Sequence, residues 1–359
     1  MKKKLLSIVL CIVVLTSLMV GCGSKDAATS SDTKKIGVAM PTKDLQRWNQ
    51  DGANMKASLE EAGYEVDLQY ANNDVATQVS QIENMITNGC DALVIASIDG
   101  GSLGTVLAGA KDKKIPVIAY DRLIMETDAV SYYATFDNTM VGTIQGQYIV
   151  DQLDLNNAAG PFNIELFTGS PDDNNARFFF GGAMDILTPF IESGKLNVVS
   201  GQKAFEEVAT LNWSTEEAQK RMENLITAYY ADGTVLDVVL SSNDSCAIGI
   251  TNALVNAGYT GDTFPILTGQ DCDVTSMKNI LAGTQSMSIF KDTRTLAAQV
   301  VTMVSAIMNG ETVPTNDTKT YDNGTGIIPT FLCVPVFADA TNYKALLIDS
   351  KYYTEDQLK

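Results

Sequence analysis

Acidic and amide side chains stand together in the stretch "GSPDDNNARFFFGG", Gly169 to Gly182. Carboxylates accept hydrogen bonds, whereas amides both accept and donate them, so Asp173 and Asn175 could bind a ligand rich in hydroxyl groups. A purely structural role is the alternative, because proline and paired Asp or Asn residues also form turns and cap the helix that follows. The choice between the two depends on the rest of the chain.

The chain has two tryptophans, and both stand among polar residues rather than inside apolar runs. Trp48 occurs in "KDLQRWNQD" and Trp213 in "TLNWSTEEAQ". Either ring could be a core residue. An indole beside Arg, Asp and Asn also suits a pyranose, whose C–H faces stack on an aromatic ring while its hydroxyl groups make directional bonds.

The sequence contains no histidine, which removes Ser-His-Asp and Cys-His triads and HExxH zinc sites. Asp172 and Asp173 are paired acids, the residue type that hydrolyses glycosides. Glycosidases hold their two carboxyl groups about 5–9.5 Å apart on either side of the bond, and nothing in adjacent residues demands that geometry. We therefore expect no catalytic residue, no enzymatic activity and no cofactor. Turnover of a glycoside by the purified protein would contradict this.

Short β-rich runs alternate with amphipathic helical patterns along the chain. Such alternation predicts parallel sheets covered by helices. A chain of 359 residues is also long for a single core and natural for two domains. The expected strands are 35–41, 65–71, 92–97, 116–121, 132–136, 162–169, 196–201, 237–243, 264–271 and 286–291.

Polar residues follow almost every expected strand. In order, the strand ends read "PTK", "SIDG", "YDR", "FDN", "GSPDDNN", "SSND", "GQD" and "FKD". In open α/β sheets, ligands bind outside the carboxyl ends of the strands. Because the pattern recurs in each half of the chain, we expect two similar sheets that offer their carboxyl edges to one shared cleft.

The first residues predict export. A basic start at Lys2 to Lys4 precedes an apolar run and small residues at Gly21-Cys22, which is typical of a secretory signal rather than a membrane span. The ending "LMVGC" resembles a bacterial lipobox, with Met19 at the position that usually carries leucine. The expected parts are a signal peptide at 1–21 and, at 22–34, a lipidated Cys22 with a flexible tether.

This start predicts a protein held by one lipid group at the outer face of the cytoplasmic membrane, in the periplasm or at the cell surface. An ordinary cleaved signal followed by an unmodified cysteine is the alternative. The whole chain carries a net charge of −18, and loss of the signal removes three lysines and no acid. A protein with this much negative charge repels nucleic acid and anionic lipids. We therefore expect neither as a partner.

Four cysteines remain beyond the signal and the lipidation site. Cys90, Cys246, Cys272 and Cys333 are widely spaced and form no CxxC motif. Such cysteines are typically small buried apolar residues. A bridge between Cys246 and Cys272 remains possible at this point.

Motifs across the chain resemble one family. They are "IGVAMPTKDLQRWNQDGANM", "SQIENMITNGCDALVIASIDG", "VIAYDRLI", "SYYATFDN", "GPFNIELFTGSPDDNNA", "LTGQDCD" and "IFKDT". Together they resemble the type I periplasmic sugar-binding proteins of ABC transporters, above all those that bind xylose or several monosaccharides. The resemblance extends over residues 35–359.

The resemblance implies which residues contact a sugar. Arg47 and the pair Asp121-Arg122 match hydroxyl-binding positions in a first lobe, and Trp48 matches the ring that stacks on the sugar. The further contacts implied are Asp173, Asn175, Trp213, Asn243, Asp271 and Lys291. Lys43, in "PTK", is a weaker match that we expect at the sugar's rim.

The same resemblance implies an α/β architecture of two doubly wound parallel-sheet lobes joined by a three-crossing hinge. The implied bounds are 35–139 and 292–323 for the first lobe, 140–291 and 324–359 for the second, and crossings near 138–141, 290–292 and 322–326. It implies a monomer that captures a sugar of the xylose, glucose, galactose or arabinose type and delivers it to an ABC transporter permease. Which sugar is preferred stays open.

Other classes of protein share features with this chain. Sugar repressors share the fold but begin with a basic helix-turn-helix, whereas this chain begins with a signal. A receptor that feeds a chemosensory or two-component system without transport stays open. Some sugar-binding relatives carry a calcium loop; here the nearest stretch, "DLNNAAGPFNIE", has Ala158 where a third oxygen ligand should stand. We therefore expect no metal.

Overall fold

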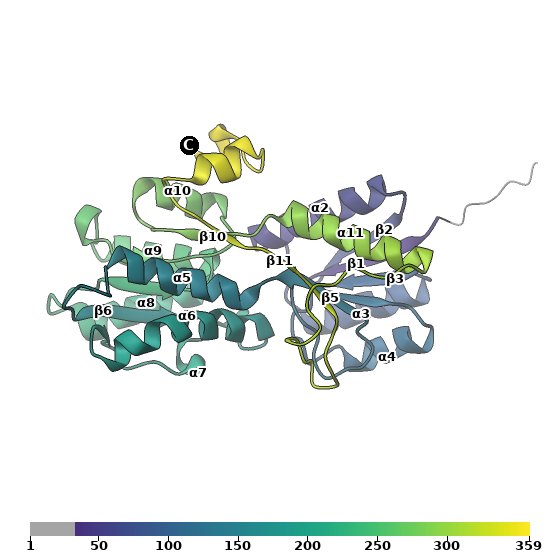
Figure 1. Cartoon of the computed structure of the whole chain (residues 1–359), viewed down its shortest axis with the longest axis horizontal. Coiled ribbons are helices and arrows are strands. Elements are labelled where there is room, and N and C mark those ends of the chain that lie inside the picture. The colour runs from purple at the N-terminus through teal and green to yellow at the C-terminus, as the bar shows by residue number, and fades with distance from the viewer. Residues whose placement is uncertain (1–32) are drawn as a thin grey trace, which may run out of the picture. The chain divides into compact units, whose positions relative to one another are not determined.

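The computed structural model describes residues 33–359, and those from Lys34 to Lys359 form one compact unit. The expected signal peptide at 1–21, the expected lipidation site Cys22 and nearly all of the tether at 22–34 lie outside the described residues. Among the described helices, none is long and apolar enough to cross a membrane. Figure 1 shows two lobes, each built on a sheet with helices on both faces.

The first lobe contains a six-stranded sheet in the order β11-β5-β4-β3-β1-β2, and every pairing in it is parallel. Five of the strands come from the first part of the chain, whereas β11 arrives from near the C-terminus. The strands are β1 (Lys35–Met40), β2 (Glu65–Tyr70), β3 (Ala92–Ile95), β4 (Val117–Tyr120), β5 (Tyr132–Phe136) and β11 (Thr330–Cys333).

Two pairs of helices cover this sheet. They are α2 (Gln46–Glu61) with α11 (Thr293–Asn309), and α3 (Val75–Thr87) with α4 (Gly104–Asp112). Met55 of α2 and Val300 of α11 share one core cluster with Val38, whereas Met85 of α3 and Leu107 of α4 lie in another. Successive residues of a strand point to opposite faces, so the two clusters occupy opposite faces of the sheet.

The second lobe repeats the arrangement with the strand order β7-β6-β8-β9, again parallel throughout. Its strands are β6 (Phe162–Phe167), β7 (Leu196–Val198), β8 (Val238–Ser241) and β9 (Ile266–Leu267). Helices α5 (Asn138–Gln152) and α6 (Asn174–Glu192) bury Ile149 and Leu187 against one face. Helices α8 (Thr215–Leu225) and α9 (Asp244–Asn256) bury Met222 and Ile250 against the other.

Helices α5 and α6 approach each other closely because of two glycines. A Cβ on Gly142 would lie 1.9 Å from the backbone oxygen of Phe179, and one on Gly182 would lie 2.2 Å from that of Thr139. Any larger residue at either position would push the helices apart. This contact explains Gly182, the second glycine of the "FFFGG" run, whereas a Cβ on Gly181 would meet nothing within 4 Å.

A small antiparallel sheet of β10 (Ser288–Phe290) and β12 (Val336–Ala338) completes the second lobe. Beside it lie α10 (Val274–Ala282) and the C-terminal helices η4 (Lys344–Asp349) and η5 (Glu355–Leu358), which share a core cluster with Phe290. The remaining short helices are α7 (Phe205–Val208), η1 (Leu211–Trp213), η2 (Ile226–Tyr230) and η3 (Gly261–Thr263).

The chain passes between the lobes three times: between β5 and α5, between β10 and α11, and between β11 and β12. The first passage, at Asp137, lies one residue before the predicted crossing near 138–141, and the second, at 291–292, lies within 290–292. The third prediction, at 322–326, is wrong, because Thr330 to Cys333 still pair with β5 in the first sheet. The second lobe therefore resumes after Cys333, at residues 334–335, and not at 324.

The possible bridge between Cys246 and Cys272 is not present. Cys90, Cys246, Cys272 and Cys333 are all free and buried. Burial also raises the pKa of the Cys246 thiol to about 12. These cysteines are therefore small apolar core residues, as their spacing indicated.

Candidate functional site

A pocket lined mostly by buried residues lies between the carboxyl ends of the two large sheets. Both lobes contribute to its wall. The lining residues are Leu45, Arg47, Trp48, Asp121, Arg122, Asp173, Asn175, Phe179, Trp213, Asn243, Ser245, Gln270, Asp271 and Lys291.

In the first lobe, the site residues follow β1 and β4. Helix α2 begins one short loop after β1, which places Arg47 and Trp48 in its first turn. Asp121 directly follows β4 and has a left-handed backbone, with φ of 58°. Its carbonyl oxygen accepts from the hydroxyl groups of Tyr133 (2.7 Å) and Thr135 (2.9 Å). These bonds hold the strained turn that aims Asp121 into the cavity.

In the second lobe, Asp173 caps a helix, which is one of the two roles that its sequence suggested, and it also lines the cavity. One carboxylate oxygen accepts from the backbone N–H of Asn175 (3.0 Å) and so caps helix α6. The other accepts from Nε1 of Trp213 (3.2 Å) and lies 2.9 Å from Nε of Arg122 in the first lobe. Asn243 caps α9 in the same way, through the N–H of Cys246 (3.0 Å).

Asp271 follows β9 in a backbone conformation that L-residues seldom adopt. Its φ is 102°, and that of Cys272 is 53°. The segment is fixed by the bond from the N–H of Asp271 to the oxygen of Ile289 (2.8 Å) and by the bond from the N–H of Cys272 to Ser288 Oγ (3.0 Å). Strained backbone that is held by its surroundings is characteristic of functional sites.

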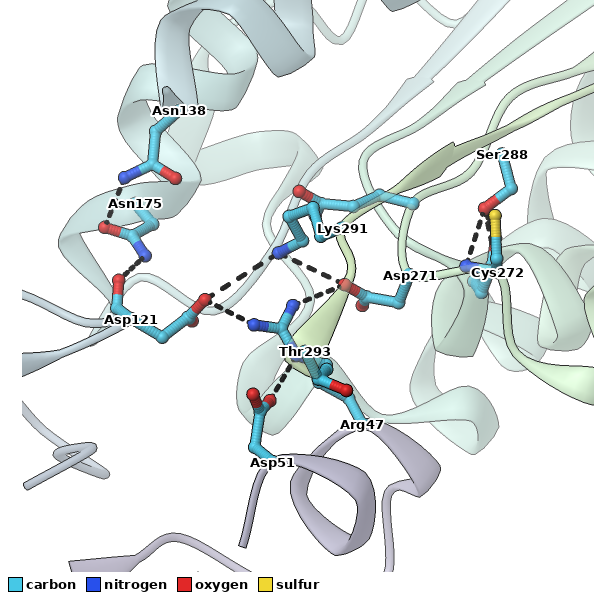
Figure 2. A network of polar contacts seen from close by, with 12 residues as sticks. Arg47, Asp51, Asp121, Asn138, Asn175, Asp271, Cys272, Ser288, Lys291 and Thr293 are labelled. Atoms are coloured by element: carbon cyan, nitrogen blue, oxygen red, sulfur yellow. Dashed lines mark hydrogen bonds and ion pairs between the residues drawn. The ribbon is translucent and has the colours of Figure 1, made fainter. Parts of the chain in front are cut away.

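Three carboxylates surround the guanidinium of Arg47 (Figure 2). Its Nη2 donates to Asp121 at 2.7 Å, its Nη1 to Asp271 at 2.9 Å, and its Nε to Asp51, one turn further along α2. Lys291 adds a second cation, with Nζ 3.1 Å from the same oxygen of Asp271. Because Asp121 and Asp271 belong to different lobes, Arg47 joins the two halves of the cavity.

Aromatic rings form the apolar walls. The guanidinium of Arg122 lies 4.9 Å from the centre of the Trp48 ring. In the second lobe, Trp213 contacts Phe179 edge to face at 6.1 Å. Gly169 lets Trp213 lie against the backbone, since a Cβ there would be 1.9 Å from the indole. The cavity is therefore bounded by aromatic rings from both lobes.

The charged groups influence each other's pKa. Burial raises the pKa of Asp121, but Arg47 and Lys291 outweigh burial, so the pKa lies below the usual value. Burial also dominates at Asp173, and there Arg122 offsets it only in part, so that pKa is raised. Burial lowers the pKa of Arg47, but the neighbouring carboxylates hold it well above its usual value. Asp121 is therefore the more firmly ionised of the two acids.

The structure brings together all the residues predicted to contact a sugar except Lys43. Lys43 is exposed, and its Nζ lies 4.8 Å from the ring centre of Tyr70, outside the cavity. The prediction that Lys43 reaches the rim of a ligand is therefore not supported by its position. Its backbone oxygen instead accepts from Asn49 Nδ2 (2.6 Å) at the start of α2.

Sequence reasoning missed four lining residues: Leu45, Phe179, Ser245 and Gln270. Phe179 lies one helical turn after Asn175 on the same face of α6, so its spacing was a usable signal. Ser245 stands in the first turn of α9, and Gln270 precedes Asp271 in "GQD". Leu45 gave no signal, because a lone leucine before a helix is usually core.

The fold and the site define a class of protein: a two-lobed binding protein whose ligand lies between the lobes and is held by both. Rings on both sides and ionised donors and acceptors around them suit a neutral ring with many hydroxyl groups. Among the described residues, no group of acids or cysteines is arranged to hold a metal ion.

Comparison with known proteins supports this class. A family model described as periplasmic binding protein domain matches residues 36–312. The chain is 53% identical over 334 residues to the multiple sugar-binding periplasmic receptor ChvE of Rhizobium radiobacter, covering 92% of this chain and 94% of that one. It is 36% identical to the D-xylose-binding periplasmic protein of Escherichia coli, with full coverage of both chains.

Among solved structures, an ABC transporter solute-binding protein from Clostridium phytofermentans with bound β-D-glucose is 71% identical. The match covers 91% of this chain and all of that one, with a TM-score of 0.89. The present chain therefore belongs to the type I periplasmic sugar-binding proteins, and the resemblance inferred from its motifs is confirmed.

Proposed function

We propose that this protein captures a neutral monosaccharide in the interlobe cavity and delivers it to the permease of an ABC transporter. The observation that carries the proposal is the cavity itself, in which aromatic rings from both lobes flank three carboxylates and three cations. Glucose is the first candidate, since the solute-binding protein from C. phytofermentans contains it. Xylose, galactose and arabinose remain in the class.

The charges serve as hydrogen-bond partners, because a monosaccharide carries no charge to balance. Bonds with one ionised partner contribute roughly 1.5–3 kcal/mol, against about 1 kcal/mol for neutral pairs. Asp121, Asp173 and Asp271 accept from hydroxyl groups, while Arg47 and Arg122 donate to them. The cations also compensate the acids within the cavity.

Ligand contacts from both lobes favour the closed form, so binding shifts the population toward it. Direct bonds between the lobes add to closure. Asn175 Nδ2 donates to the oxygen of Asp121 (2.6 Å), and the N–H of Gly100 donates to the oxygen of Asp172 (3.3 Å). The closed pair of lobes is the surface that the permease recognises in this proposal.

Anchoring follows from the sequence and belongs to the same proposal. Cleavage after Gly21 leaves Cys22 as the lipidated first residue, and the polar tether keeps a monomeric binding unit in water near the outer face of the membrane. A second function is favoured by the word receptor in the name of the ChvE relative: the loaded protein would contact a membrane sensor instead of, or in addition to, a permease.

The test is calorimetric titration of residues 23–359, unfolded and refolded to remove bound sugar, with glucose, xylose, galactose, arabinose and fucose in separate runs. Tight one-to-one binding of one or several of these sugars supports the proposal and gives the range. Binding to none of them would move the ligand to another class and overturn it. If a sugar binds, deletion of the gene for the candidate permease or for the candidate sensor would distinguish transport from signalling.

A further inference from the structure

Asp51 is a wholly buried acid that lies behind the cavity and does not line it. One of its oxygens accepts from Nε of Arg47 and the other from the hydroxyl of Tyr120 on β4. An acid buried at such depth is costly unless both oxygens have strong donors. Asp51, Arg47 and Tyr120 therefore form one buried hydrogen-bonded group, with Asp51 at its centre.

The hydrogen bond from Nε of Arg47 to Asp51 fixes the far end of the Arg47 side chain. A guanidinium carries five N–H donors in a planar fork. In Arg47 the Nε donor points back to Asp51, and each Nη donates once, to Asp121 or Asp271. One N–H on each Nη is then left for hydroxyl groups of a ligand. The orientation of the guanidinium depends on which group accepts the hydrogen bond from Nε.

We propose that Asp51 is a positioning residue for sugar binding: in its ionised form it holds Nε of Arg47, so that both Nη atoms face the cavity. The inference rests on the proposed function. Without the charge on Asp51, the carboxylates of the described residues that still bond Arg47 are those of Asp121 and Asp271, which sugar hydroxyl groups also need. The guanidinium then turns toward these acids and competes with the ligand for them.

The electrostatic surroundings make this role dependent on pH. Burial raises the pKa of Asp51 to about 6, although Arg47 opposes the rise. The groups that face Asp51 are Arg47 on its own helix, Tyr120 and Asp121 at the end of β4, Tyr70 on β2 and Tyr352 in the C-terminal segment. Protonation near pH 6 removes the charge that orients Arg47, so sugar affinity falls as the pH drops from 7.5 to 5.

The experiment compares the sugar affinity of residues 23–359 with that of three variants by calorimetry between pH 5 and 8, using the sugar that the wild type binds. Asp51→Asn keeps the size of the side chain and removes its charge. Tyr120→Phe removes only the donor to the other oxygen of Asp51. Glu60→Gln is the matched control, because Lys56 and Glu60 form an exposed i,i+4 pair (3.2 Å) on the same helix.

We expect Asp51→Asn to weaken binding about 10- to 100-fold at pH 7.5, and to lose the component of the pH profile centred near pH 6. Tyr120→Phe should bind almost normally at pH 8, with that component moved to higher pH, because the ionised acid has lost a donor. Glu60→Gln should match the wild type. A merely structural role for Asp51 predicts none of the shift in Tyr120→Phe.

Wild-type affinity and an unchanged profile in Asp51→Asn would overturn the inference. If Asp51→Asn does not fold, an unmoved profile in Tyr120→Phe overturns it equally. A wild type that binds no sugar is a different result, which contradicts the proposed function itself.

Discussion

Nε1 of Trp213 donates to Oδ2 of Asp173 at 3.2 Å, and the same oxygen lies 2.9 Å from Nε of Arg122 in the opposite lobe. An aromatic wall of the second lobe and a cation of the first are thus held by one carboxylate oxygen. Its partner oxygen caps helix α6. Asp173 therefore connects local structure, cavity wall and lobe closure in a single side chain.

Substitutions at Asp173 should separate these roles. Asn is as good an N-cap as Asp, so Asp173→Asn should keep the cap of helix α6 but bind sugar at least tenfold more weakly. Asp173→Ala should lose the cap as well, at a further cost of about 1 kcal/mol in stability. Thermal unfolding and calorimetry measure the two effects. Asp172→Ala, one exposed residue away, is the control and should change neither.

Removal of the Asp271 carboxylate should leave a folded protein that has lost most of its sugar affinity. In Asp271→Ala, Arg47 and Lys291 lose an acceptor inside a closed cavity. A bond of this kind contributes about 1.5–3 kcal/mol, so the dissociation constant should rise roughly 10- to 200-fold. Circular dichroism checks the fold and calorimetry the affinity. Unchanged affinity would remove Asp271 from the binding site.

The two tryptophans should report sugar binding separately. Trp48 faces the cavity with Arg122 over its ring, whereas Trp213 is hydrogen-bonded and packed on Gly169. We expect Trp48 to produce the main fluorescence change on binding, so Trp48→Phe should abolish most of the signal and weaken binding. Trp213→Phe should keep the signal. A full response in Trp48→Phe would make Trp213 the reporter.

The buried acids behind Asp271 should lower stability as the pH rises. Burial raises the pKa of Asp273 to about 7, with the charge of Asp271 adding to the rise. Between pH 4 and 7 the folded chain then holds a proton that the unfolded chain has lost. Stability therefore falls with increasing pH, by up to about 1.4 kcal/mol per pH unit. Denaturant unfolding of Asp273→Asn should show a flatter pH profile; an identical slope would contradict the assignment.

Tyr353 should influence how fast the closed form opens. Its hydroxyl accepts from Nε2 of Gln46 (2.7 Å) and Gln50 (3.0 Å) on α2 and donates to the oxygen of Cys272 (2.9 Å), beside Asp271. Tyr353→Phe removes all three bonds and should speed sugar release severalfold in stopped-flow measurements. Tyr343→Phe, in the same C-terminal part of the chain, serves as the control. Equal release rates would show that these bonds do not limit opening.

The sequence predicted most of the fold because its strands are buried, short and followed by polar residues. It missed β11 and β12, although β11 completes the first sheet. "TFLC" and "VFA" lie close together without a helix between them, so no strand–helix alternation marked them. The third crossing was misplaced for the same reason, since only the pairing of Thr330 to Cys333 with β5 shows where the chain leaves the first lobe.

The site was predictable where chemistry stands at a strand end, as at Asp121 and Asp271. Lys43 stands at such an end too, yet the loop turns it outward to Tyr70, and spacing alone does not give that direction. Asp51 is the opposite case. An acid four residues after an arginine is common on exposed helices, and only burial beside Tyr120 distinguishes this pair.

The position of β11 also constrains when the protein can fold. The edge of the first sheet is supplied by residues 330–333, so that sheet cannot be complete until nearly the whole chain has been synthesised. A polypeptide that we propose to be exported must remain unfolded until it has crossed the membrane. The order of strands in this protein delays completion of the native sheet until the last part of the chain arrives, which is compatible with the export that we propose.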